Sequence, residues 1–443
     1  MKSKIKKYVL TAVLSASVSL IGMGAAYAVD ISETVGMAVE NNPSLKIKSA
    51  EKNISKQNMY EARSAFFPQL SVTAQAGRIS QNNDTTRAAT TDQDDAQSYM
   101  GEGRVALTQP IFHGMANLNR YRATKDRRYA KDFEFQSNMV DVVRASVVSH
   151  IEVVKSRELV KETQSFLNSI AGYRERMQLM VNEGALGKSE LLQADELIIL
   201  TKNALLQYQE TLSLNEASYF ETVGQMPQLS MSVSSKSIEA LIPRTLDDAL
   251  SLAKTEHPIM RSAEMSARAF TRDANAERAG IIPRIDTEVS YSKKDQDDTL
   301  AGESENAQAL VKMTWDFSVG GAYSARVKRS LQQGARAKAD KERRTKAVER
   351  DVRQRYIELT SAGKRLDILA KREKANVDIF NSYEQEYDAG KRSILELINA
   401  KNKVFESKIN YLNAYYKRQS AKYDLLGAMG QIHKAFGFYT AQN

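Results

Sequence analysis

A short glycine-rich run, Gly184-Ala185-Leu186-Gly187-Lys188-Ser189, is the part of this sequence that most looks built for chemistry. Its Gly-Lys-Ser ending is that of a phosphate loop, in which backbone N–H groups and the lysine hold nucleotide phosphates. A phosphate loop also needs a glycine at position 182, where this chain has Asn182, and a strand before the first glycine. The run therefore does not predict nucleotide binding.

The other reactive side chains do not form a recognisable catalytic or metal site. No cysteine occurs, and no G-x-S-x-G or H-E-x-x-H motif is present. The histidines are scattered without metal-ligand spacing; they are His113, His150, His257 and His433. We therefore expect no catalytic residue, no metal and no cofactor, and a protein that is not an enzyme.

The amino terminus has the organisation of a secretory signal peptide. A basic stretch with four lysines precedes about sixteen mostly apolar residues, from Tyr8 to Met23, and Ala26-Tyr27-Ala28 follows as a cleavage site. Residues 1–28 are thus predicted to be removed, and a single spanning helix is the alternative. Removing those four lysines from the formal charge of +9 leaves +5, which is mild and gives no sign of nucleic-acid binding. The absence of cysteine excludes a lipid anchor on that residue.

The remaining chain consists of two copies of one unit. The proline pairs Pro43/Pro258 and Pro68/Pro283 are both separated by 215 residues, whereas later landmarks are separated by 206. Those later landmarks are Thr108/Thr314, Gly114/Gly320, Gly184/Gly390, Ala194/Ala400 and Gly224-Gln225/Gly430-Gln431. We expect repeat 1 at 29–228, a linker at 229–245 and repeat 2 at 246–443, with the nine-residue length difference in a loop.

Each unit reads as short helices, a β-hairpin and a long helical hairpin. Alternating apolar and polar residues predict hairpins at about 69–111 and 284–317. Residues 115–183 and 320–389 lack proline and read as helices of roughly 100 Å. In the second copy an apolar stripe repeats every three or four residues from Val352 to Tyr387, the spacing of a coiled-coil contact. Each long helix is expected to reverse at a tip near Gly184 or Gly390.

The strand count predicts an oligomer. After the signal peptide no apolar run approaches 18 residues, so a membrane crossing would need a closed β-barrel. Four strands per chain cannot close one, and an open sheet edge in lipid is prohibitive. Three chains would give a 12-stranded β-barrel and a twelve-helix tunnel, whereas two would give an eight-stranded barrel, which side chains tend to fill. Because a water-filled conduit favours three, we expect a homotrimer with a mixed α+β fold whose β-barrel contacts outer-membrane lipid. Trp315 and Phe317 would form an aromatic girdle at the periplasmic membrane interface.

An ordered set of motifs resembles the TolC family of outer-membrane channels. They are Glu61-Ala62-Arg63-Ser64, Phe67-Pro68-Gln69-Leu70, Leu107-Thr108-Gln109-Pro110-Ile111-Phe112, and the two tip glycines, each ten residues before an alanine. The resemblance covers essentially the whole mature chain and implies a trimeric 12-stranded outer-membrane β-barrel continued by a periplasmic α-helical barrel. It implies docking, at the tips with Gly184 and Gly390, to a periplasmic adaptor and an inner-membrane ABC or proton-driven pump.

The resemblance also implies a gate at the periplasmic tip. Tyr387 would bind Glu190, and Arg392 would bind Ser189. An aperture ring maps onto Glu396 and Asn399; the second position is usually Asp in the family, so this chain departs from the pattern there.

The function expected from these observations is a passive exit duct of a tripartite export system. The alternative is a periplasmic coiled-coil adaptor or structural interaction protein, which would carry one helical hairpin and no lipid-facing strands. The cargo, drug or secreted protein, stays open at this stage.

Overall fold

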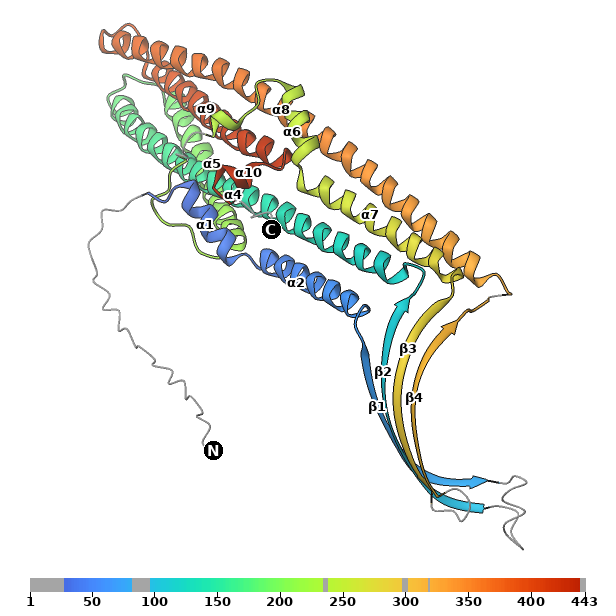
Figure 1. Cartoon of the computed structure of the whole chain (residues 1–443). Helices are drawn as coiled ribbons and strands as arrows, with labels where there is room; N and C mark the ends of the chain where they lie inside the picture. Colours follow the sequence, from blue (N-terminus) through green and yellow to red (C-terminus); the bar gives the residue numbers. More distant parts are fainter. Residues whose placement is uncertain (1–27, 82–95, 234–237, 297–301, 318, 439–443) are drawn as a thin grey trace, which may run out of the picture.

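The computed structural model describes residues 28–81, 96–233, 238–296, 302–317 and 319–438 (Figure 1). The expected signal peptide, residues 1–28, lies outside this range except for its last residue. In the described part a four-stranded sheet projects from one end of an elongated bundle of helices (Figure 1). The last described residues, up to position 438, lie near the middle of the bundle (Figure 1).

The elements occur twice in the same order. The first set is α1 (Ile31–Asn41), α2 (Pro43–Ser64), β1 (Gln69–Gln81), β2 (Ala96–Phe112), α4 (Ala116–Asn182) and α5 (Lys188–Val223). The second set is α6 (Leu246–Glu256), α7 (Pro258–Arg278), β3 (Arg284–Gln296), β4 (Glu303–Thr314), α8 (Ala322–Asp388) and α9 (Ile394–Ala428). Short helices η1 (Glu239–Leu241), η2 (Ala279–Ile281) and α10 (Ile432–Ala435) complete the described fold.

The two spacings found in the sequence have a structural cause. β1 and β3 start 215 residues apart, whereas α4 and α8 start 206 apart and are both 67 residues long. The nine additional residues of the first copy therefore lie between β1 and α4, in the β-hairpin. Asn42 and His257, which precede the paired prolines, cap α2 and α7 by accepting hydrogen bonds from Ser44 N and Ile259 N.

The sheet is antiparallel in the order β1-β2-β3-β4. One face is apolar: Leu70, Leu107, Val289 and Ala309 lie in one row across it. The opposite face carries an ion-pair ladder, in which Arg104 and Lys312 both bind the Glu288 carboxylate at 2.6 and 2.5 Å. This separation of faces suits a wall with lipid on one side and water on the other.

Each long helix packs against different helices at its two ends. Near the sheet, α4 packs against α2 and α7, and α8 packs against α7; towards the other end, α5 returns along α4 and α9 along α8 (Figure 1). Contacts between α4 and α9 join the two copies, and there the rings of Phe166 and Phe405 stack with centroids 4.2 Å apart. None of the helices in the described part of the chain is both long and apolar enough to span a bilayer.

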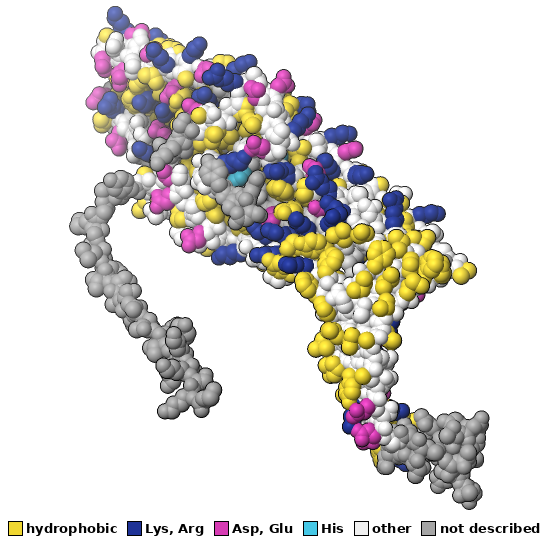
Figure 2. Space-filling view, in the orientation of Figure 1, with side chains coloured by type: hydrophobic (Ala, Val, Ile, Leu, Met, Phe, Trp, Pro, Cys, Tyr) yellow, Lys and Arg dark blue, Asp and Glu magenta, His cyan; other side chains and the backbone are white. Residues whose placement is uncertain are grey.

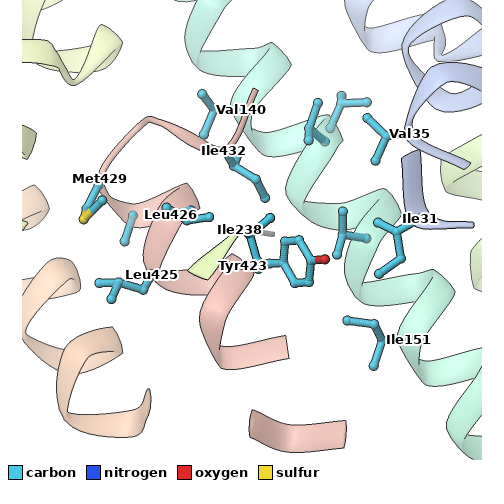
Figure 3. Packing of buried hydrophobic residues seen from close by; sticks show 14 of the residues in the cluster. Ile31, Val35, Val140, Ile151, Ile238, Tyr423, Leu425, Leu426, Met429 and Ile432 are labelled. Carbon is cyan, nitrogen blue, oxygen red and sulfur yellow. The ribbon is translucent and has the colours of Figure 1, made fainter. Parts of the chain in front are cut away.

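The largest core lies at the waist of the bundle, where the short helices meet the long ones (Figure 3). α1, α4, α9 and α10 contribute, together with Ile238, which immediately precedes η1. The side chains include Ile31, Val35, Val140, Ile151, Ile238, Tyr423, Leu425 and Ile432. Because these residues come from both copies and from the segment between them, the waist holds the two repeats together.

A buried polar chain crosses this core. The Thr34 hydroxyl lies 2.7 Å from His150 Nδ1 and 3.2 Å from the Tyr219 hydroxyl. His150 Nε2 lies 2.9 Å from the carbonyl oxygen of Ser232, a residue whose N–H donates to the Val29 carbonyl. The two histidine contacts fit a neutral ring that donates from Nε2 and accepts at Nδ1. His150 thereby fastens the linker to α1 and α4.

Candidate gate at the hairpin tips

The two tips have the same backbone design. Gly184 and Gly390 end α4 and α8 with φ of 74° and 69°, the left-handed region that only glycine enters without strain. Ala185 N donates to Met180 O and Lys391 N donates to Glu386 O, both at 2.8 Å, which closes each helix end. The phosphate-loop-like run thus follows a helix and forms a helix reversal.

Arg392 is the most strongly held charged residue of the second tip. Its Nε donates to Glu386 Oε2 at 2.8 Å, and its Nη1 donates to Glu396 Oε1 at 2.9 Å. Its guanidinium carbon also lies 4.1 Å from the centre of the Tyr383 ring, a cation–π contact. The hydrogen bonds to Glu396 and Glu386 raise the pKa of Arg392 further above its ordinary range.

Glu396 has a structural task in addition to its charge. Its Oε2 accepts hydrogen bonds from Ser393 N at 3.0 Å and Ser393 Oγ at 2.9 Å, while Glu396 N donates back to Ser393 Oγ. This is a capping box that starts α9. The bonds from Ser393 and Arg392 lower the pKa of Glu396, so the carboxylate is ionised at neutral pH. Asn399, one turn further along, is exposed.

Glu190 occupies the equivalent position in the first tip. Its Oε2 accepts a hydrogen bond from Gly187 N at 3.0 Å at the start of α5, and it lies 206 residues before Glu396. Ser189 beside it is exposed. Within this described tip region of one chain, neither Ser189 and Arg392 nor Glu190 and Tyr387 form a hydrogen bond.

Tyr387 joins the two hairpins through packing. Its ring contacts a cluster formed by both tips, in which Met177 and Leu191 of the first hairpin meet Ile394 and Ile398 of the second. It also contacts a second cluster, which contains Phe380. The structure therefore gathers the first and second tips around Tyr387 in one chain.

Two contributors to this site, Glu386 and Tyr383, were not identified from the sequence. Glu386 immediately precedes Tyr387, and Tyr383 lies one turn earlier on α8. The sequence does show that Glu386 and Arg392 carry opposite charges six residues apart, on either side of Gly390. Because a helix reversal brings such positions together, this spacing could have predicted the pair.

At the other end of the molecule, Trp315 and Phe317 follow β4 directly. The strand ends at Thr314, three residues short of the expected hairpin boundary at 317. The Trp315 indole N–H donates to Ile281 O at 3.0 Å, and its ring lies 4.7 Å from that of Phe317. Figure 2 shows hydrophobic side chains gathered along the sheet and at this junction with the helices.

Comparison with known proteins identifies the family. The profile of the outer membrane efflux proteins matches residues 34–225 and 249–431, one match in each repeat. The chain belongs to this family. The outer membrane efflux protein BepC of Brucella suis is 24% identical, with 96% of this chain and 91% of BepC aligned. The alkaline protease secretion protein AprF of Pseudomonas aeruginosa is 21% identical, over 92% and 84% of the two chains.

The fold agrees with this assignment. The outer-membrane channel CmeC of Campylobacter jejuni superimposes with a TM-score of 0.80 at 14% identity, covering 91% of this chain and 86% of CmeC. This outer membrane efflux protein is therefore an outer-membrane exit duct that extends into the periplasm, and not an enzyme or a periplasmic adaptor. Members of the family work with inner-membrane pumps and adaptors in tripartite systems, and trimers are typical among them.

Proposed function

We propose that this exit duct is a homotrimer whose resting state is closed at the periplasmic tip by Ser189, Glu190, Tyr387 and Arg392. Glu396 and Asn399 would line the aperture, and the turns at Gly184 and Gly390 would contact the adaptor. The observation that carries the proposal is the gathering of both tips around Tyr387 at the end of the bundle far from the sheet (Figure 1). A narrow end held by a few polar side chains can be opened by a partner that binds the other state better.

The sheet supports the trimeric assembly. β1 and β4 are its edges, with 13 and 12 residues whose outward backbone groups have no strand partner within the described chain. Lipid cannot satisfy those groups, so edges must pair between chains. Three chains would close a 12-stranded barrel wide enough for a water-filled duct, with Trp315 and Phe317 as its periplasmic girdle. The mass of the detergent-solubilised protein should equal three chains, and a monomer would contradict this arrangement.

We also place the repeats at 29–228 and 246–443, joined by the linker 229–245. In this proposal the duct does not choose its cargo: a periplasmic adaptor and an ABC or proton-driven pump supply it. BepC is named for efflux and AprF for protease secretion, and one duct of this design could serve either kind of pump.

The gate is tested by combining Tyr387→Phe with Arg392→Ser. The purified channel in planar bilayers should then show a larger conductance than the parent, because ties at the narrow end are removed. Arg365→Ser is the matched control, since Arg365 is exposed on α8 away from the tip. A double variant that assembles normally and conducts like the parent would show that these residues are not the latch.

A further inference from the structure

Glu386, Glu396 and Tyr383 form a clamp around Arg392 that leaves two of its five guanidinium N–H hydrogens without a partner among the described residues. Glu386 Oε2 lies 2.8 Å from Nε and 2.7 Å from Nη2, and Glu396 Oε1 lies 2.9 Å from Nη1. A guanidinium has five N–H groups in a rigid fork. These three contacts use three of the five hydrogens, so one N–H of Nη1 and one of Nη2 remain for a further acceptor.

The residues that hold Arg392 come from both helices that flank the Gly390 turn. Glu386 belongs to the last turn of α8, whereas Glu396 belongs to the first turn of α9 and is itself held by Ser393. Tyr383 covers the guanidinium face. A long arginine side chain usually loses much rotamer freedom when it binds a partner. Here three neighbours have already restricted it.

Glu386 also stands where a carboxylate is unfavourable without a partner. The carboxyl end of a helix carries partial negative charge, which repels an acidic side chain in the last turn. Arg392 offsets that repulsion, and the Glu386 side chain is only 37% exposed in the pair. The placement gains its benefit only through Arg392.

We propose that Glu386 is a positioning residue of the gate, which holds the Arg392 guanidinium in place so that its unpaired N–H groups meet an acceptor across the tip. The inference rests on the gate function proposed above. Tyr383 assists from the ring face. Glu386 does not itself line the aperture in this account, so it changes how often the channel opens and leaves ion selectivity unchanged.

The experiment compares Glu386→Gln with Asp388→Asn in planar bilayers, each in the parent and in the Arg392→Ser background. Asp388 is an exposed acid two residues later with no hydrogen-bond partner among the described residues, so its variant removes the same charge from the same turn. We expect Glu386→Gln to raise the open probability on the order of fivefold. Asp388→Asn should leave it unchanged, and Glu386→Gln should add nothing once Arg392 is Ser.

The outcomes separate the inference from the gate itself. If Arg392→Ser opens the channel and Glu386→Gln does not, the positioning role is overturned while the gate stands. An equal increase in both backgrounds, or a shifted reversal potential, would show that Glu386 acts independently of Arg392 and would also overturn it. No effect of Arg392→Ser would overturn the gate role of Arg392 and this inference together. Glu386→Asp, which keeps the charge with a shorter reach, should be intermediate if the variants fold.

Discussion

Mild acid should release the linker from the waist of the duct. His150 is fully buried, with its Nδ1 facing the Thr34 hydroxyl and its Nε2 facing the Ser232 carbonyl. Burial lowers the pKa of His150 to about 4, against the effect of the Ser232 hydrogen bond, which raises it. A protonated ring would place a second N–H against Thr34 and a charge in an apolar core.

The size of the effect follows from the two pKa values. An unfolded histidine titrates at about 6.5, so the opened state binds more protons than the closed state between about 6.5 and 4. The stability that His150 contributes is therefore fully present above pH 6.5 and is lost as the pH falls towards 4. Between pH 7.5 and pH 5 the loss is about 2 kcal/mol per chain, or about thirtyfold in the opening equilibrium.

Amide hydrogen exchange reports this opening at one residue. The Ser232 N–H donates to Val29 O at 3.0 Å and exchanges only when the linker detaches. After correction for intrinsic rates, its protection should fall about thirtyfold from pH 7.5 to pH 5. In His150→Gln, protection should be lower at pH 7.5 but should hardly change with pH. Equal pH dependence in the parent and in this variant would show that protonation of His150 does not detach the linker.

Three further predictions concern the sheet, a turn and the aperture. Val311 lies on the apolar face of β4 and is 75% exposed in one chain. Val311→Arg should destabilise the membrane-inserted barrel by roughly 2–4 kcal/mol and reduce the yield of assembled trimer on gels. Gln308→Arg, on the opposite face of the strand, should assemble normally. Gly430→Ala should lower the thermal midpoint more than Gly184→Ala: a Cβ at Gly430 meets Pro258 Cδ at 2.7 Å, whereas at Gly184 nothing lies within 4 Å. Equal decreases in the thermal midpoint would mean that the positive φ of each glycine, and not the contact with Pro258, determines the cost. Glu396→Gln keeps a side chain that can cap α9 but removes the carboxylate charge. Reversal potentials in a salt gradient should therefore show a weaker cation preference. An unchanged reversal potential would place Glu396 away from the ion path.

Much of the fold follows from patterns that a single sequence displays. Proline spacing located the starts of α2 and α7, and the absence of proline located the two long helices to within a few residues. Two glutamates, Glu373 and Glu384, interrupt the apolar stripe between Val352 and Tyr387. The first pairs with Lys408, whose Nζ lies 3.2 Å from Glu373 Oε1. The end of β4 was placed too late because alternation continues through Trp315, whereas its indole turns to the Ile281 carbonyl.

The candidate site was less accessible to sequence reasoning. The positions of the tip residues came from the resemblance to a family, and the pattern alone could not show which acid holds Arg392. Glu386 and Glu396 lie on different helices, so only the turn at Gly390 brings them together. The link between Thr34, His150 and Ser232 joins residues more than eighty positions apart, and no local periodicity encodes such a contact.

If the aperture of the duct lies at the hairpin tips, a bulky group attached at Asn399 should block it. The chain contains no cysteine, so Asn399→Cys introduces a single thiol per chain at an exposed position in the second turn of α9. The measurement is the bilayer current before and after a bulky thiol reagent is added on the periplasmic side. We expect the current through the variant to fall sharply and the current through the parent to stay unchanged. Complete labelling with no loss of current would contradict it.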